Sequence, residues 1–170
     1  LLYDRNGMIE YEGLFKDDVV IDVNDDMRMK WIDDCELIVT SCIESLIIAD
    51  HFNPPDISSL ILNYSLISLK QIEIGDDCFA NVNRFEIDGL NELETIVIGW
   101  RCFSLNNGPI EGSKCLIMNC DQLSEIHIGY RSFCWCESFE LKNLSSLISI
   151  QLDDFSFCLC RSIVFEGMNE

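Results

Sequence analysis

The chain has 170 residues, with 30 Asp or Glu against 11 Lys or Arg, so its formal net charge at pH 7 is −19. A surface of this sign repels the phosphate backbone, so we expect no nucleic-acid partner, and an anionic membrane leaflet is disfavoured for the same reason. No apolar run approaches the ~20 residues that a membrane-spanning helix needs, so no membrane insertion is expected.

Residues 1–34 carry the pattern of a β-hairpin. Asn6 and Gly7 separate two apolar stretches, and the Asn-Gly dipeptide favours a type I′ turn. The stretch 11–16, Tyr-Glu-Gly-Leu-Phe-Lys, resembles the start of a MORN-type unit, whose hairpins carry Tyr-x-Gly and a following aromatic residue. We expect this MORN-like hairpin to cap an array that follows it, because an open end would expose unpaired strand edges.

Residues 35–68 show a repeat pattern in weakened form. Residues 47–52 (Ile-Ile-Ala-Asp-His-Phe) imitate residues 74–79 (Ile-Gly-Asp-Asp-Cys-Phe) with a changed second residue. Pro54 and Pro55 follow and should interrupt regular strand pairing. We interpret this segment as one or more degenerate repeats.

Clear repeats occupy residues 69–168. The phrase Leu-x-x-Ile-x-Ile-Gly-x-x-Cys-Phe starts at Leu69 and at Leu93, and variants start at Leu123 and Leu147. These starts are 24, 30 and 24 residues apart, so the middle interval is one period plus a six-residue insertion. Self-similarity at such a period indicates a solenoid, in which each unit buries its apolar face against its neighbours.

Each clear repeat contains two short stretches in which a β-branched, aromatic or other apolar residue occupies every second position. This pattern is typical of half-buried strands. The expected strands lie at 72–74, 85–87, 96–98, 115–117, 126–128, 139–141, 150–152 and 163–165. Copies one period apart should pair in parallel, because every strand comes round in the same direction. The sequence therefore predicts a mainly β, leucine-rich-repeat-like solenoid with two parallel strand ladders, preceded by an antiparallel hairpin.

Two features recur at the end of the first strand of each unit. Gly75, Gly99 and Gly129 follow it, and Asp153, another residue that tolerates turns, replaces them in the last unit; we expect such residues there because the chain must turn. The phenylalanine four residues further on is invariant among the units and should form a buried column; its members are Phe79, Phe103, Phe133 and Phe157. The insertion, at about residues 104–112, contains Asn, Gly and Pro and should form a surface loop.

The repeat phrase resembles the leucine-rich repeat superfamily, in particular the BspA-like subgroup common in protists and bacteria. The resemblance covers residues 60–168 well and residues 35–59 poorly. The chain departs from the commonest leucine-rich pattern in preferring Ile to Leu in the strand and in lacking an asparagine ladder. The resemblance implies a curved solenoid over residues 35–170 that recognises proteins, and it carries no catalytic residues to transfer.

The ten cysteines behave as structural residues in the repeat register. Cys78 and Cys102 occupy one repeat position, which Ser132 and Ser156 fill in later units. Cysteine thus alternates with small residues, as it does when it serves as a buried hydrophobe. This pattern favours a reducing compartment, so we expect a cytoplasmic protein. The chain begins at Leu1 and stops after an incomplete repeat, so we interpret it as a fragment, which leaves open whether the parent carries a targeting segment.

Four cysteines one period apart offer an alternative. They are Cys134, Cys136, Cys158 and Cys160. Four thiolates could hold zinc, or the thiols could be oxidised, in an extracellular adhesive protein; Asn63 and Asn143 fit the glycosylation pattern. We favour structural thiols, because Ala80 and Val82 fill the equivalent positions of the first unit, which we therefore expect to point inward. Cys-x-Cys is also tighter than the usual spacing of zinc ligands.

The candidate partner-binding residues come from outward positions. They are Trp100, Arg101, Tyr130, Arg131, His127 and Glu125. Trp, Tyr and Arg are enriched at interface hot spots, and neighbouring coils should bring the first four together, with Asp76, Asp77 and Glu125 as a charged rim. The alternative is ordinary loop residues lying flat on the edge of the repeats.

Established catalytic motifs are missing from the sequence. No Gly-rich phosphate loop, nucleophile elbow or His-Glu-x-x-His motif occurs. We therefore expect no enzyme, no cofactor and no small-molecule substrate. The predicted function is a non-catalytic protein-interaction module whose protein partner is unidentified.

Overall fold

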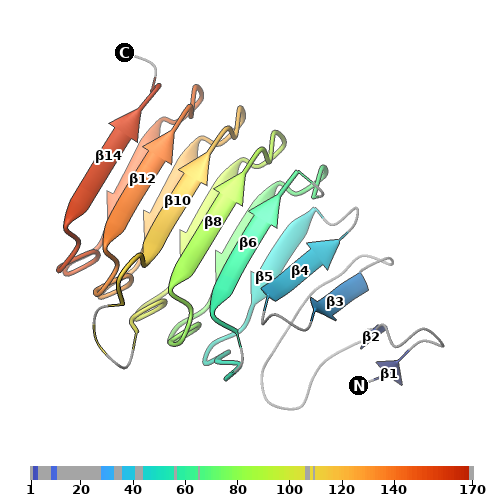
Figure 1. Cartoon of the computed structure of the whole chain (residues 1–170). Coiled ribbons are helices and arrows are strands. Elements are labelled where there is room, and N and C mark those ends of the chain that lie inside the picture. Colours follow the sequence, from blue (N-terminus) through green and yellow to red (C-terminus); the bar gives the residue numbers. More distant parts are fainter. Residues whose placement is uncertain are drawn as a thin grey trace.

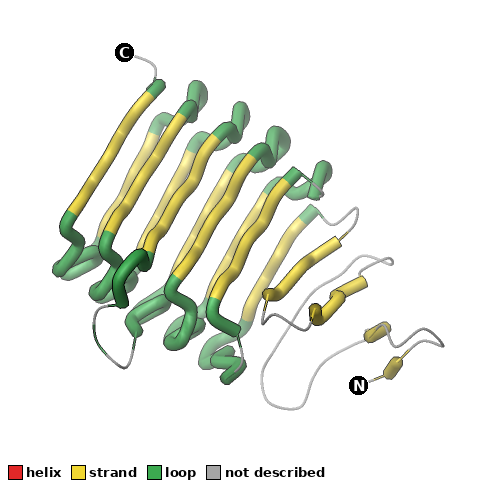
Figure 2. Tube along the Cα trace, viewed as in Figure 1, coloured by secondary structure: helices red, strands yellow, loops and turns green. Residues whose placement is uncertain are grey.

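The computed structural model describes residues 44–168, except residues 56, 65, 106, 107 and 109, and also four short strands nearer the N-terminus. All regular elements of this described part are β-strands (Figures 1 and 2). The Asn6-Gly7 turn and the MORN-like stretch 11–16 lie outside the described residues.

Two sheets contain the described strands. The larger runs in the order β1 (Leu2–Tyr3), β2 (Ile9–Glu10), β3 (Arg28–Ile32), β4 (Glu36–Thr40), β6 (Ser59–Asn63), β8 (Arg84–Asp88), β10 (Lys114–Met118), β12 (Ser138–Lys142) and β14 (Ser162–Glu166). The smaller runs in the order β5 (Ser45–Ile48), β7 (Gln71–Ile74), β9 (Thr95–Ile98), β11 (Glu125–Ile128) and β13 (Ser149–Leu152). Successive strands alternate between the two sheets from β4 onward, which is the winding of a solenoid (Figure 1).

The strand pairing confirms the two parallel ladders and the 24-residue spacing. In the smaller sheet Ile72 pairs with Ile96, and Ile126 pairs with Ile150. In the larger sheet Ile87 pairs with Ile117 across the six-residue insertion, so the additional residues leave the register unchanged. At the other end β1 pairs antiparallel with β2, and β2 to β4 continue antiparallel into the edge of the larger sheet.

The register of β5 differs by one residue from the sequence alignment. That alignment placed Ile47 opposite Ile74, whereas the structure pairs Ile48 with Ile74 and Leu46 with Ile72. Leu46 and Ile48 point into the core and are buried, so a shift by one residue would turn the apolar side chains of β5 outward. The alignment of this degenerate unit was therefore wrong.

The predicted phenylalanine column is confirmed. Phe79, Phe103, Phe133 and Phe157 are buried in the space between the two sheets. The ring centroids of Phe79 and Phe103 are 5.1 Å apart, those of Phe103 and Phe133 are 4.6 Å apart, and those of Phe133 and Phe157 are 5.0 Å apart, all stacked. Each coil thus contributes one ring to a continuous aromatic spine.

The physical reason for the turn glycines differs from the expected one. Left-handed backbone occurs instead at the second residue after each glycine, as at Arg101 and Arg131, and again at the spine phenylalanines. Gly75, Gly99 and Gly129 are outside the left-handed region. Neighbouring coils approach so closely that a Cβ would lie 2.6–3.0 Å from preceding backbone atoms, as at Gly129. The close approach of the coils, and not turn freedom, therefore explains these three glycines, whereas Asp153 fills the equivalent position in the last coil.

Two asparagines form a short ladder at the end of the larger sheet's strands, although the sequence was interpreted as lacking one. The Asn119 side-chain amide donates to Asp88 Oδ1 at 2.7 Å, and that of Asn143 donates to Asn119 Oδ1 at 2.9 Å. Asn119 and Asn143 have φ of 54° and 53°, positions where Gly89 and Gly167 stand in other coils. Asparagine tolerates this backbone better than most residues and adds the inter-coil bond.

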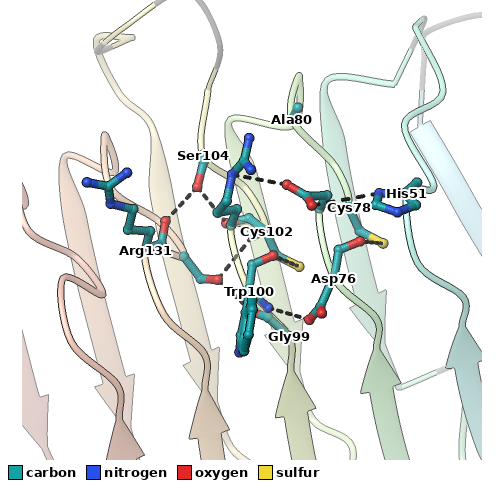
Figure 3. Close-up of polar contacts among 12 residues, drawn as sticks. His51, Asp76, Cys78, Ala80, Gly99, Trp100, Cys102, Ser104 and Arg131 are labelled. Carbon is teal, nitrogen blue, oxygen red and sulfur yellow. Dashed lines mark hydrogen bonds and ion pairs between the residues drawn. The ribbon is translucent and has the colours of Figure 1, made fainter.

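The position shared by Cys78, Cys102, Ser132 and Ser156 is a hydrogen-bond donor position in addition to being buried. The Cys102 thiol donates to the carbonyl of Gly75 at 2.9 Å, and the Ser132 hydroxyl donates to the carbonyl of Gly99 at 2.7 Å. Ser132 Oγ also accepts from the Cys102 backbone N–H at 3.0 Å (Figure 3). Cysteine and serine therefore alternate here because both are small and both donate to the coil before.

Ser132→Ala should lower the free energy of unfolding by about 1–3 kcal/mol, because it leaves the Gly99 carbonyl and the Cys102 N–H buried without this partner. Ser132→Cys should cost clearly less, since the thiol donates at this position in an earlier coil. Urea unfolding of the three proteins measures both changes. Equal losses for Ala and Cys would show that the donor has no energetic role.

The last coil has a partner on one side only within the described chain. Phe157 stacks on Phe139 with ring centroids 4.1 Å apart, which covers the core from this end. Five further apolar side chains of this coil are exposed: Leu152, Phe155, Leu159, Ile163 and Phe165.

Candidate partner-binding site

A hollow opens at the turns that follow three consecutive strands of the smaller sheet. Its lining residues are Trp100, Arg101, Tyr130, Gln151, Leu152, Asp153 and Asp154. We call it the turn hollow. Trp100 and Arg101 come after β9, Tyr130 comes after β11, and the remaining residues end or follow β13. Of the six candidates, the structure therefore brings Trp100, Arg101 and Tyr130 to one hollow.

The backbone beneath Trp100 is held by the coil before it. The Trp100 N–H donates to Asp76 Oδ1 at 2.7 Å (Figure 3). The Asp76 N–H donates in the same way to Asp50 Oδ1. The Trp100 carbonyl accepts from the Asp77 N–H at 2.7 Å. The Trp100 side chain nevertheless remains 59% exposed. An exposed indole thus stands on a fixed backbone.

Arg101 is paired at the surface. Its Nε lies 3.1 Å from Asp77 Oδ1, and His51 Nδ1 lies 3.7 Å from the other oxygen of the same carboxylate (Figure 3). Asp77 therefore serves two neighbouring coils. Exposed pairs of this kind stabilise little, so this carboxylate mainly orients the Arg101 guanidinium.

Arg131 belongs to an aromatic cluster beside the turn hollow. Its guanidinium carbon lies 5.3 Å from the centre of the Tyr130 ring and 5.8 Å from that of Phe155, within cation–π range. The Tyr130 and Phe155 rings meet edge to face at 5.8 Å. Phe155 was not among the candidates, although it occupies the same repeat position as Arg101 and Arg131 and the repeat register could have identified it.

His127 and Glu125 take different places from the first four candidates. His127 Nε2 lies 3.3 Å from Asp153 Oδ1 and 3.2 Å from Gln151 Nε2, so it supports the wall of the turn hollow without lining it. Glu125 begins β11, at the strand end away from Tyr130, and is not among the lining residues. The carboxylates of the hollow come instead from Asp153 and Asp154.

The four candidate metal-site cysteines separate into two columns. Cys136 is buried at the position of Val82, and Cys160 follows it in the next coil, while Cys134 and Cys158 occupy the more exposed position of Ala80. The expectation of inward positions was therefore wrong for the second column. Cys134 and Cys158 Sγ lie 3.1 Å apart. No group of three or more His, Cys, Asp or Glu in the described part of the chain is arranged to hold a metal ion.

Burial keeps several of these thiols protonated. It raises the pKa of Cys136 to about 12, and together with the hydrogen bond to Cys158 it raises the pKa of Cys134 to about 12. Burial also raises the pKa of Cys120 to about 11. The thiolate is the form that binds metals and attacks electrophiles, so these three groups have low reactivity at neutral pH.

Comparisons with protein-family models, with curated proteins and with solved structures give no match to this chain. Within its described residues no helix has the length and apolarity to cross a membrane. The architecture defines the class: this is a β-solenoid repeat protein of about five turns, with a hollow of aromatic and charged residues along one row of turns.

Proposed function

We propose that this chain is a non-catalytic protein-interaction module that binds a protein partner through the turn hollow. We include in the proposal a cytoplasmic location and membership of the BspA-like leucine-rich repeats, with a MORN-like cap over residues 1–34. The repeat phrase carries the family proposal. The free thiols of the described cysteines, most of them buried in the core, support a reducing compartment.

The observation that carries this function is the exposed Trp100 on a backbone fixed by Asp76. Binding loses less conformational entropy when the anchor is already positioned, and Trp has few rotatable bonds for its contact area. Tyr130 and Arg101 stand in the same hollow and are also residue types enriched at hot spots. A partner side chain that covers the indole would bury apolar surface of Trp100 that is exposed to solvent in the solenoid alone.

Charge favours a basic segment in the partner. Asp153 and Asp154 line the turn hollow, and the net charge of the whole chain is −19. Arg101 is already paired with Asp77, and Arg131 lies on the rings of Tyr130 and Phe155. A Lys- or Arg-containing segment with an apolar side chain thus fits the site, and the attraction should weaken as salt is added.

Alanine variants of the two aromatic anchors test the proposal. Trp100→Ala and Tyr130→Ala should each weaken the partner at least about tenfold, or about 1.4 kcal/mol. Partners are captured on the immobilised wild-type chain, purified, and titrated against each variant by calorimetry at low and high salt. Tyr64→Ala is the matched control, because Tyr64 is 75% exposed and follows β6 in the other sheet.

The control variant should bind as the wild-type chain does. If Trp100→Ala and Tyr130→Ala both retained full affinity for every captured partner, the turn hollow would not be the binding site. If affinity rose with salt, the partner would not be recognised through its positive charge.

The extracellular or zinc-stabilised alternative has less support. The Asn143 side chain, which glycosylation would modify, donates to Asn119 in the inter-coil ladder. Its neighbour Leu144 is buried in the core. A sugar on Asn143 would be attached to the same nitrogen that donates this hydrogen bond and would have to fit beside the neighbouring coil, so the glycosylation pattern at this position does not favour an exported protein.

A further inference from the structure

We infer that Cys134 and Cys158 form a redox-sensitive cross-link between the last two coils. Their sulfurs lie 3.1 Å apart, and they occupy equivalent positions in consecutive coils. Adjacent parallel segments are about 4.8 Å apart, which falls within the roughly 4.4–6.8 Å that separates the Cα atoms of a disulfide. The Leu159 N–H donates to the Cys134 carbonyl at 3.2 Å, so the two backbones lie side by side and this spacing admits the bond.

Solvent access distinguishes this pair from the other described thiols. Cys158 is exposed and Cys134 is half-buried. The remaining described cysteines are buried apart from Cys160, whose thiol donates to the carbonyl of Ser162 at 3.0 Å. A soluble oxidant therefore reaches Cys158 first, and Cys134 is the thiol within reach to complete the bond.

The proposed oxidant is a small disulfide such as oxidised glutathione. The Cys158 thiolate attacks one of its sulfurs, which forms a mixed disulfide and releases one glutathione thiolate. The raised pKa of Cys134 slows its reaction with dissolved reagents, but the sulfur of the Cys158 mixed disulfide lies next to it. Cys134 therefore gives its proton to solvent and attacks this neighbouring sulfur, releasing the second glutathione. Two protein thiols are oxidised to one disulfide, one glutathione disulfide is reduced to two thiols, and the two protons end on the glutathiones.

Among the described coils, the cross-link acts on one that has a neighbouring coil on one side only. This coil packs against the spine through Phe157 and leaves Leu159, Ile163 and Phe165 exposed, so its local opening should be easier than that of inner coils. A bond to Cys134 ties it to a coil that is covered on both sides. The inference does not depend on what the turn hollow binds.

The test treats the full chain with oxidised glutathione and maps its disulfides by peptide mass spectrometry. The wild-type protein should become two hydrogens lighter, with Cys134 linked to Cys158 and no retained glutathione. Cys134→Ser should instead keep one glutathione on Cys158. Cys160→Ser is the matched control from the same coil and should cross-link as the wild type does.

Thermal unfolding provides the second measurement. Oxidation should raise the Tm of the wild-type protein by about 5 °C or more and leave that of Cys134→Ser without such a rise. A stable mixed disulfide on wild-type Cys158, or a link between Cys158 and any other cysteine, would overturn the proposed pair. A Cys134–Cys158 bond that left the Tm unchanged would overturn its effect on the last coil.

Discussion

Replacing Phe103 with Ala should lower the free energy of unfolding by about 3–5 kcal/mol. Phe103 is buried in the middle of the aromatic spine, stacked between Phe79 and Phe133, and its ring also meets that of Phe85 at 4.9 Å. Because rings stand on both sides, the cavity cannot close without moving two coils. Urea unfolding followed by circular dichroism measures the loss.

Val97→Thr is the matched control for this variant. Val97 lies on β9 in the same coil, is partly exposed on the outer face of the smaller sheet, and retains its β-branched shape as Thr. Its cost should stay within about 0.5 kcal/mol. A Phe103→Ala protein as stable as the control would mean that the spine does not hold the coils together.

Gly129→Ala is expected to be as disruptive as a large cavity, although it adds one methyl group. Its Cβ would lie 2.6 Å from the carbonyl oxygen of Gly99 and 2.7 Å from its carbon, and backbone cannot move aside as a flexible side chain can. We expect a loss of about 3 kcal/mol, at the upper end of overpacking costs, since relief requires separating two coils. Chemical unfolding measures it.

Gly112→Ala separates steric contact from backbone preference. Gly112 has φ of +78°, and a methyl group added there would meet nothing within 4 Å, so only its left-handed backbone is penalised. The cost should be about 1–2 kcal/mol. If Gly112→Ala cost as much as Gly129→Ala, the close approach of coils would not explain the turn glycines.

The repeat phrase was sufficient to predict the architecture. Its period fixes which residues share a column, so the ladders and the spine followed from Ile72, Phe103 and their counterparts without any contact being known. The same reasoning gave the wrong register at residues 47–52. The glycine that marks the turn in the clear repeats is replaced there by Ala49, so no glycine was present to fix the alignment.

Contacts between coils were beyond the sequence pattern. Cysteine and serine at one position indicated small side chains, but the carbonyl of Gly99 that receives the Ser132 hydroxyl belongs to another column. The ladder through Asn119 was missed for a similar reason, since its first member is the aspartate Asp88. A period identifies equivalent positions, whereas the bonds from Ser132 to Gly99 and from Asn119 to Asp88 join positions that are not equivalent.

The candidate site was predicted in part. Trp100, Arg101 and Tyr130 could be grouped because they follow the same turn in neighbouring units. The direction of each side chain could not be obtained from the column alone, so Arg131 was not expected to lie on Phe155. Glu125 was misplaced because it shares a strand with His127 but begins it at the far end.

A Cys or Ser side chain of one coil donates a hydrogen bond to a glycine carbonyl of the coil before it, and this bond recurs along the solenoid. Successive coils therefore present the same bonding groups to one another. The segment 95–124 provides the Gly99 carbonyl that accepts from Ser132, and the segment 125–148 provides the Gly129 carbonyl that accepts from Ser156. If a tandem copy of residues 125–148 were inserted after residue 148, the serine of the copy would donate to the Gly129 carbonyl. The glycine carbonyl of the copy would in turn accept from Ser156 of the following coil. Such a molecule can lengthen or shorten over evolutionary time by whole-unit duplication and deletion, while its internal chemistry stays the same.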